Sequence, residues 1–224
     1  ENVTLNSSSG NNHTTDNLTV YYDTYDTNDD SIKNITNWHM NGTSITVLNM
    51  PFEADGDQNA TDYSSFNNSG TVSGDPFWNS TGGYDGFGAY SFDGVDDYIG
   101  GFGDVLDMGT RDFSLEARFK TGTTDRGYMI GKLEIHGGNN PSYFMWISET
   151  NNNVHCHAVT AESNYILALN SVVDVNDSVW HHVVCSVDRD GFGSLYLDGV
   201  LKHNVSISAY SGESLSNDHS FMIG

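Results

Sequence analysis

Phe113-Ser114-Leu115-Glu116-Ala117-Arg118-Phe119-Lys120 is the stretch of sequence that decides the fold. Apolar and polar residues alternate along it without a break, so one face is apolar and the other is hydroxylated or charged. Successive side chains of a β-strand point to opposite faces, whereas a helix needs apolar residues three or four positions apart. The stretch therefore predicts a β-strand that is buried on one face.

Two further segments repeat this alternation. In Val154–Val159 the first, third and fifth residues are apolar or cysteine, and His155 and His157 point the other way. In His181–Val187 every second residue from Val183 onward is valine or cysteine. Strands that each carry one apolar face bury it by packing two sheets together. The expected fold is all-β, a two-sheet antiparallel sandwich with these residues buried: Phe92, Phe113, Leu115, Phe119, Val183, Val187, Leu195 and Leu197.

The net charge of the chain limits the classes of molecule that it can bind. The 224 residues carry a formal charge of −22, because 30 acidic residues face only 8 lysines and arginines. Such a surface repels phosphate backbones, so nucleic acid is not an expected partner. No apolar run approaches the ~18 residues that a membrane helix needs, and no direct membrane insertion is expected. Divalent cations or a medium of high salt concentration could each neutralise the excess of carboxylates, and the composition does not separate the two.

Glycosylation sequons are dense, above all before residue 82. Their number predicts an extracellular, cell-surface glycoprotein. The chain opens Glu1-Asn2-Val3-Thr4 without a signal peptide, so we expect a mature product or an internal slice of a longer protein. The sequon asparagines are Asn2, Asn6, Asn12, Asn17, Asn34, Asn41, Asn59, Asn67, Asn79, Asn176 and Asn204.

The two cysteines, Cys156 and Cys185, both lie in strand-like segments. An exported protein with an even number of cysteines permits one disulfide between them. Two buried thiols acting as small apolar side chains are the alternative. The sequence leaves both open.

The first 47 residues are more polar and richer in sequons than the rest. Trp38–Gly42 reads Trp-His-Met-Asn-Gly, which predicts a strand followed by a tight Asn-Gly hairpin turn, and Ser44–Met50 is the returning strand. This pattern resembles the closing half of an immunoglobulin- or cadherin-like repeat. We expect residues 1–47 to be a partial repeat of that kind, or a linker, and residues 48–224 to form the sandwich.

A family resemblance rests on an ordered set of motifs. Ala89–Ile99 reads Ala-Tyr-Ser-Phe-Asp-Gly-Val-Asp-Asp-Tyr-Ile, Trp180–Val184 reads Trp-His-His-Val-Val, and Leu195–Val200 reads Leu-Tyr-Leu-Asp-Gly-Val. Together with Asp112–Lys120 they resemble the laminin-G-like, or concanavalin A-like, superfamily over about residues 48–224. The resemblance implies a jelly-roll sandwich. The family normally continues past Gly224 into one more strand, so the sandwich is expected to lack its last strand.

The resemblance also implies a structural calcium ion. Asp62–Gly70 resembles the Asp/Asn/Gly loop with which members of the family commonly hold calcium. Carried over to this chain, the ligands are Asp62 and Asn68, and Asp55 is close enough in sequence to assist.

Carbohydrate binding is a frequent task of the same family, and it needs outward polar and aromatic groups. Phe144 and Trp146 share one face of Tyr143–Ser148, but that segment is apolar on both faces, which favours burial of both aromatics in the core. The expected ligand-binding residues are Glu116, Arg118, His182 and Tyr196, which point outward from their strands.

Catalysis is not expected. The glucanase branch of the superfamily uses paired carboxylates on one strand, and neither Glu-x-Asp-x-Glu nor Glu-x-Asp-x-x-Glu occurs in the chain. A zinc site built from His155, His157 and His182 is a weaker hypothesis, because it requires their strands to be neighbours.

Two classes of function stay open. The first is a non-catalytic extracellular module, calcium-stabilised and glycosylated, that serves adhesion or binds glycans or other surface proteins within a larger surface protein. The second is a structural repeat of an extracellular filament, sheath or coat that assembles with copies of itself by strand addition. A third alternative is an accessory domain of a polysaccharide-degrading enzyme.

Overall fold

The computed structural model describes two compact units, Glu1–Thr36 and Asn37–Gly224, each of which is treated separately below. The division falls after Thr36 rather than after residue 47, because Ser44 is buried and exchanges hydrogen bonds with Ser65 of the second unit. The described residues are 2–11, 13, 15–28, 32–53, 59–133, 140–160 and 165–224.

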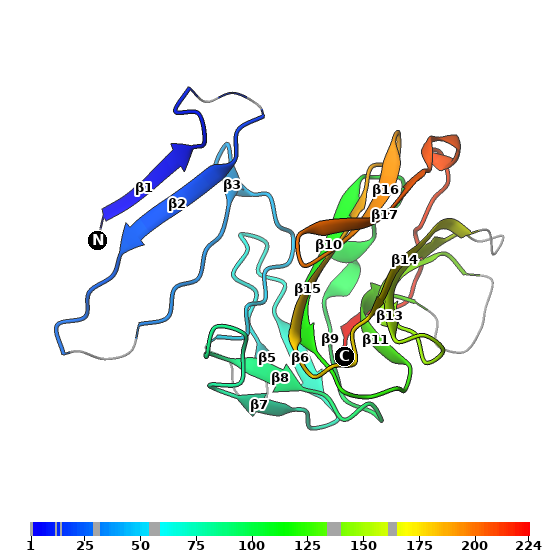
Figure 1. The fold of residues 1–224 in the computed structure, drawn as a ribbon, viewed down its shortest axis with the longest axis horizontal. Helices are drawn as coiled ribbons and strands as arrows, with labels where there is room; N and C mark the ends of the chain where they lie inside the picture. Colours follow the sequence, from blue (N-terminus) through cyan, green and yellow to red (C-terminus); the bar gives the residue numbers. More distant parts are fainter. Residues whose placement is uncertain are drawn as a thin grey trace. The chain divides into compact units, whose positions relative to one another are not determined.

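The second unit is a sandwich of two antiparallel sheets, which face each other in Figure 1. One sheet has four strands in the order β10 (Phe113–Lys120), β15 (Trp180–Val187), β16 (Phe192–Leu197) and β17 (Val200–Ser206). The other has eight strands in the order β14 (Tyr165–Asp174), β13 (Asn153–Val159), β12 (Ser142–Ile147), β11 (Gly127–Lys132), β18 (Phe221–Ile223), β9 (Tyr98–Gly100), β6 (Gly70–Ser73) and β5 (Asn59–Ala60). The predicted all-β sandwich is confirmed.

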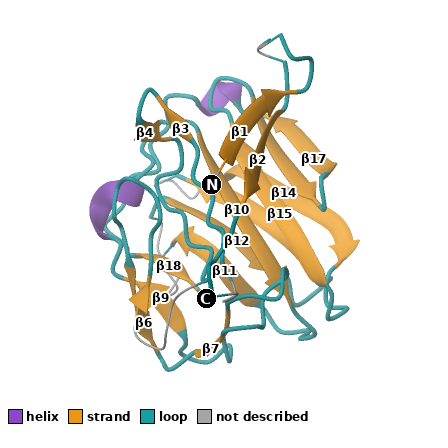
Figure 2. Cartoon of the chain, turned by 90° about the vertical axis from the view of Figure 1, so that its left-hand side faces the viewer, coloured by secondary structure: helices purple, strands orange, loops and turns teal. Residues whose placement is uncertain are grey.

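The remaining elements are short. Two-stranded ribbons are formed by β3 (His39–Met40) with β4 (Thr43–Ser44) and by β7 (Phe77–Asn79) with β8 (Ala89–Ser91). The described helices are two 3₁₀ turns, η1 (Gly103–Leu106) and η2 (Ser208–Tyr210), drawn in purple in Figure 2. Within the described ranges, no helix has the length and apolar character needed to cross a bilayer.

The expected Asn-Gly hairpin turn joins β3 and β4. Asn41 and Gly42 have φ angles of 53° and 85°, and left-handed backbone at both central positions is what a type I′ turn requires. The strands on either side are shorter than the sequence predicted, because only His39–Met40 and Thr43–Ser44 pair.

Alternation places the core between the sheets. Leu115, Val183, Val187, Leu195 and Leu197 are buried, as predicted. Phe92, Phe113 and Phe119 are only partly buried, although all three pack against the core. Phe113 and Phe119 remain partly exposed because β10 is an edge strand, and side chains at its ends have neighbours on one side only. Phe92 follows the end of β8 in a turn.

A disulfide joins Cys156 of β13 to Cys185 of β15, with 6.4 Å between their Cα atoms. Each cysteine points inward from its strand, and each is at most 1% exposed. The bond therefore connects the two sheets through the middle of the core, and the alternative of two free thiols does not hold in this structure.

β10 lies at the edge of the four-stranded sheet, and its outer side is a position at which the expected missing strand could pair. β10 pairs with β15 on one side, and no other strand of the described ranges pairs with it. Unpaired strand edges are sites at which a further strand can add. That such a strand occupies this position stays a prediction.

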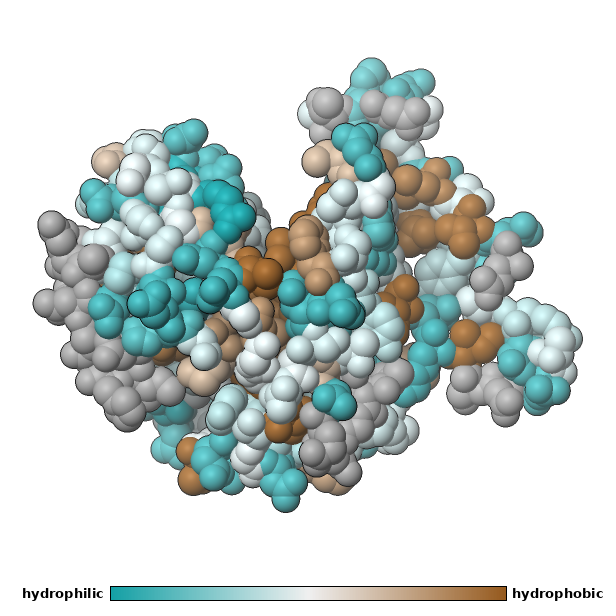
Figure 3. Space-filling view, turned by 180° about the vertical axis from the view of Figure 1, so that it is seen from behind, coloured by the Kyte–Doolittle hydropathy of each residue, from teal (hydrophilic) through white to brown (hydrophobic). Residues whose placement is uncertain are grey.

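The first unit contains one antiparallel ribbon, β1 (Asn2–Ser7) with β2 (Leu18–Asp23). Its register brings Val3 opposite Tyr22 and Leu5 opposite Val20, so one face of the ribbon is apolar. Val3, Leu5 and Tyr22 are exposed, and brown atoms gather on this part of the chain in Figure 3. The expected immunoglobulin- or cadherin-like repeat stays a prediction.

Removal of the disulfide should destabilise the sandwich without changing its fold. We expect the double variant Cys156→Ala/Cys185→Ala to lose about 3 kcal/mol of unfolding free energy, because a cross-link over 29 residues restricts the unfolded chain. Urea denaturation followed by tryptophan fluorescence measures this loss. A double variant with the midpoint and slope of the parent protein would show that the disulfide does not stabilise the sandwich.

Candidate functional site

Asp62 organises the loop that was predicted to hold calcium. It is 5% exposed, and its carboxylate accepts four hydrogen bonds from the chain. The donors are the backbone N–H groups of Asn49, Ser64 and Asn68 and the hydroxyl of Ser64, at 2.7–2.9 Å. Burial works against the charged form, but these hydrogen bonds outweigh it and hold the pKa of Asp62 below its ordinary value.

The structure brings Asp62 and Asn68 together by a hydrogen bond between them. The side-chain amide of Asn68 donates to the carbonyl of Val47 at 2.9 Å, and its backbone N–H donates to Asp62. Asp55 lies outside the described residues. A carboxylate with four donors already has the partners that a buried charge requires. Calcium at this loop stays a prediction.

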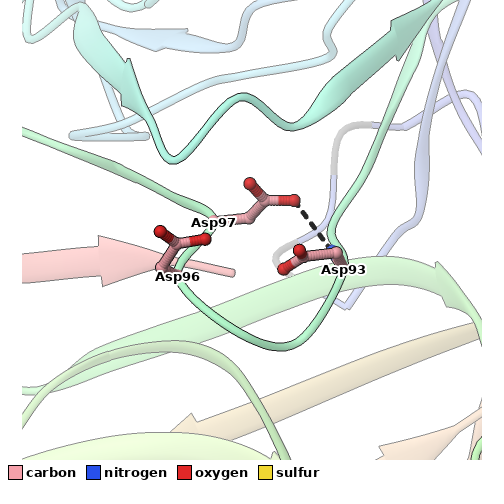
Figure 4. Close-up of side chains that lie close together, drawn as sticks. All are labelled: Asp93, Asp96 and Asp97. Atoms are coloured by element: carbon pink, nitrogen blue, oxygen red, sulfur yellow. Dashed lines mark hydrogen bonds between the residues drawn. The ribbon is translucent and has the colours of Figure 1, made fainter.

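A second group of carboxylates lies in the turn between β8 and β9, within the segment Ala89–Ile99. Asp93, Asp96 and Asp97 each place one carboxylate oxygen within 4.8 Å of the others (Figure 4). Asp97 accepts the backbone N–H of Asp93 at 2.8 Å, and Asp93 accepts that of Val95. Three carboxylate oxygens are fewer than the roughly six to eight ligands that calcium takes, and the hydrogen bonds of this group close the turn.

The four predicted ligand-binding residues share the outer face of the four-stranded sheet. Glu116 of β10 and His182 of β15 form a hydrogen-bonded pair, with 2.8 Å between Oε1 and Nε2. The guanidinium of Arg118 lies 4.4 Å from the ring centroid of Tyr84. Tyr196 of β16 is on the same face, one strand beyond β15. The sequence therefore placed these residues on one surface correctly, but their charged groups are already paired with protein partners.

This outer face also carries a sequon. Asn204 of β17 lies opposite Ser194 of β16, and its side-chain amide donates to the Ser194 hydroxyl at 3.2 Å. A glycan attached to Asn204 would extend over the same sheet surface as the predicted ligand-binding residues.

An aromatic surface lies on the outer face of the eight-stranded sheet. We call it the aromatic face and define it by Tyr128 of β11, Phe144 and Trp146 of β12, His155 and His157 of β13, and Tyr165 of β14. It forms because Tyr143, Met145 and Ile147 of β12 point into the core, which turns the residues between them outward.

The rings of the aromatic face touch one another across the strands. Tyr128 lies opposite Trp146, and Trp146 lies opposite His155, whose ring centroid is 4.9 Å from the indole. His157 contacts Trp146 at 5.7 Å and Tyr165 at 5.2 Å. The result is a continuous layer of rings, one or two from each strand. Tyr165, at 59% exposed, is the most open of them, while the others are half-buried.

An ion pair borders the aromatic face. Arg126, directly before β11, donates from Nε to Glu149 at 2.9 Å and from its terminal nitrogen to the second oxygen at 2.5 Å. Its guanidinium carbon lies 5.0 Å from the centre of the Trp146 ring. The hydrogen bond with Glu149 raises the pKa of Arg126 and lowers the pKa of Glu149, so both stay charged. The indole N–H of Trp146 is buried and has no acceptor among the described residues.

The two histidines of the aromatic face are uncharged at neutral pH. Burial lowers the pKa of His155 below its ordinary value. Burial, together with the neighbouring His155, lowers the pKa of His157 to about 4. His182 lies on the other sheet, so the zinc hypothesis, which needed all three histidines on neighbouring strands, is wrong.

The expectation that Phe144 and Trp146 belong to the core is also wrong. Both side chains of β12 that were expected to be buried face outward, away from the buried Tyr143, Met145 and Ile147. An apolar residue on each face made the strand look buried on both. The outward histidines of the neighbouring segment Val154–Val159 were the signal that this side of the sheet is a surface.

No sequon lies within the strands of the aromatic face. No Asn-x-Ser/Thr with a residue other than proline in the middle occurs between Asn79 and Asn176, the span that holds β11–β14. Elsewhere in the described ranges the sequon asparagines are exposed, with Asn176 half-buried. Attached glycans would therefore start outside the four strands of the aromatic face.

The family described as the concanavalin A-like lectin/glucanases superfamily matches residues 92–224, and the chain belongs to it. Solved structures share the fold. The binding domain of Paraclostridial Mosquitocidal Protein 1 matches with 12% identity and a TM-score of 0.59, covering 79% of this chain and 43% of that one. The Botulinum neurotoxin serotype D binding domain matches with 17% identity and a TM-score of 0.59, covering 80% and 42%. The chain thus spans less than half of these proteins. No curated protein matches it.

Lowering the pH should destabilise the sandwich through His157. Between pH 6.5 and about 4 the unfolded chain binds a proton at this histidine and the folded chain does not, so stability falls as the pH drops through that window. His181 acts in the opposite sense, because Asp198 and Asp177 outweigh its burial and raise its pKa, and its contribution is lost as the pH rises. Urea denaturation at pH 7 and pH 4.5 measures the net change.

The variant His157→Phe keeps a ring at this position and removes the titrating group. It should lose less stability than the parent protein between pH 7 and pH 4.5. His39→Gln, at an exposed position of β3, is the control and should behave like the parent. Equal losses in the parent and in His157→Phe would contradict the assignment.

Proposed function

We propose that this chain is a non-catalytic carbohydrate-binding module of an extracellular glycoprotein and that it binds its ligand on the aromatic face. The observation that carries the proposal is the layer of rings on β11–β14, bordered by Arg126 and Glu149. Sugar rings pack their C–H faces on aromatic side chains, and nearby polar groups fix their orientation. The two solved structures with the same fold are both described as binding domains, which supports a binding role.

The chemistry of the face supports binding rather than hydrolysis. A glycosidase needs one carboxylic acid to protonate the leaving oxygen and a second carboxylate about 5–9.5 Å away. Glu149 is paired with Arg126, and its lowered pKa keeps it ionised, which is the wrong state for a general acid. The same pair is suited to hydrogen bonding with sugar hydroxyls.

Two features support an extracellular setting. The disulfide between Cys156 and Cys185 is of the kind that persists in oxidising compartments. The described sequon asparagines are accessible to a glycosylation system, and none lies on the aromatic face. A glycosylated chain would keep this face open while glycans cover other parts of its surface.

The aromatic face is a better candidate than the residues expected from the sequence. On the four-stranded sheet, Glu116 is paired with His182 and Arg118 with Tyr84. At the aromatic face Arg126 is paired with Glu149, so paired charges do not distinguish the two surfaces. Asn204 adds a sequon to that surface. The aromatic face offers more ring surface, with half-buried rings on β11, β12 and β13 and the exposed Tyr165 on β14.

Replacing Trp146 should abolish most of the binding. We expect Trp146→Ala to weaken glycan binding about 30-fold, the roughly 2 kcal/mol that a central aromatic contact contributes. The measurement is a glycan array followed by titration calorimetry on the sugars that bind. Tyr196→Ala, an aromatic-to-alanine change on the other sheet, is the matched control and should bind like the parent protein.

Because Trp146 is half-buried, its variant must be shown to fold, and thermal unfolding followed by circular dichroism does so. Tyr165→Ala is a second variant for the same binding measurement, because this ring is 59% exposed and its loss disturbs little packing. Binding that survives in Trp146→Ala and Tyr165→Ala but fails in Tyr196→Ala would move the site to the four-stranded sheet. Absence of binding to every glycan would reject the proposal.

A further inference from the structure

The rings of the aromatic face form a row that crosses the strands. The row contains one ring from each of four consecutive strands: Tyr128, Trp146, His157 and Tyr165. Successive ring centroids are 6.3, 5.7 and 5.2 Å apart. The spacing is regular because each ring stands on the next strand of the same sheet.

The length of this row determines how much ligand it can contact. Neighbouring strands lie about 4.8 Å apart, so four strands span about 14 Å, or roughly three sugar units placed end to end. A site for one terminal sugar needs a ring or two at the bottom of a pocket, whereas this row has four rings, of which Tyr165 is exposed and the other three are half-buried. Ala168 of β14, opposite His157, is exposed and adds no bulk that would interrupt the row.

The charges around the row favour an uncharged ligand. Arg126 is the cation that the described contacts place on these rings, and Glu149 neutralises it. His155 and His157 add no charge at neutral pH. The chain as a whole is at −22 and repels sulfated or carboxylated polysaccharides.

Polar groups flank the row at intervals. Asn170 of β14 lies opposite His155, with 3.2 Å between its amide nitrogen and the His155 Nε2. The ion pair of Arg126 and Glu149 lies on the β12 side, and the Trp146 indole N–H is buried. A ligand along the row would meet a hydrogen-bonding group near each end and aromatic surface between them.

We propose that the aromatic face binds an internal stretch of about three units of a linear, uncharged glycan, with the sugar chain lying across β11–β14. The inference rests on the proposed function and adds the class of ligand, its direction and its length. It distinguishes a module that holds polysaccharide chains from one that recognises the terminal sugar of a branched glycan.

Titration calorimetry with ladders of cello- and manno-oligosaccharides of about two to six units tests the inference, because the row predicts a plateau at about three or four units. Affinity for at least one ladder should rise about 10-fold from the disaccharide to the tetrasaccharide, as further rings are contacted, and then stay constant. Tyr165→Ala should lose the gain from the longer chains and keep the disaccharide affinity. Heparin oligosaccharides of matched length are the charged comparison and should bind at least about 10-fold more weakly.

The outcomes separate the inference from the proposed function. Binding that depends on Trp146 but is equal for disaccharide and hexasaccharide would overturn the inference and leave the proposed function standing. Tighter binding of heparin would overturn the uncharged class in the same way. Absence of binding by every ladder and by every sugar on the glycan array would overturn both.

Discussion

The packing of two sheets against each other is the constraint on which the rest of the second unit depends. Every strand that contributes to the core must turn alternate residues inward, and the disulfide between Cys156 and Cys185 fixes one inward residue of β13 against one of β15. Once those cysteines face inward, His155 and His157 must face outward, because the side chains of a strand alternate strictly. The chemistry of the outer faces is therefore a consequence of how the core is filled.

The outer faces of the two sheets differ in the side chains that they offer to a ligand. On the four-stranded sheet, charged side chains pair with one another or with rings, as in Glu116 with His182. On the eight-stranded sheet, aromatic rings lie side by side, and the ion pair of Arg126 and Glu149 is at the border. Both faces carry paired charges, so the difference lies in the half-exposed rings, which lose only water when a sugar covers them. This difference makes the aromatic face the better binding surface.

The sequence predicted the fold well because alternation is a local property. Phe113–Lys120 and His181–Val187 each encode which side is buried, and the family motifs set their order. It predicted the site poorly because Tyr143–Ser148 is apolar on both sides, so the outward Phe144 and Trp146 could not be told from core residues without knowing what lies over them. The contact between Trp146 and Arg126 joins residues from different strands and has no local signal in the sequence.

The most direct test of the account is to map the ligand onto the sheets by nuclear magnetic resonance. Cellohexaose and mannohexaose would be titrated, each separately, into the ¹⁵N-labelled protein, and the amide and indole signals followed. If the aromatic face is the binding surface, the shifts are concentrated on β11–β14, and the indole signal of Trp146 moves furthest among the four tryptophans. Shifts concentrated on β10, β15 and β16, or no shifts with either sugar, would contradict this prediction.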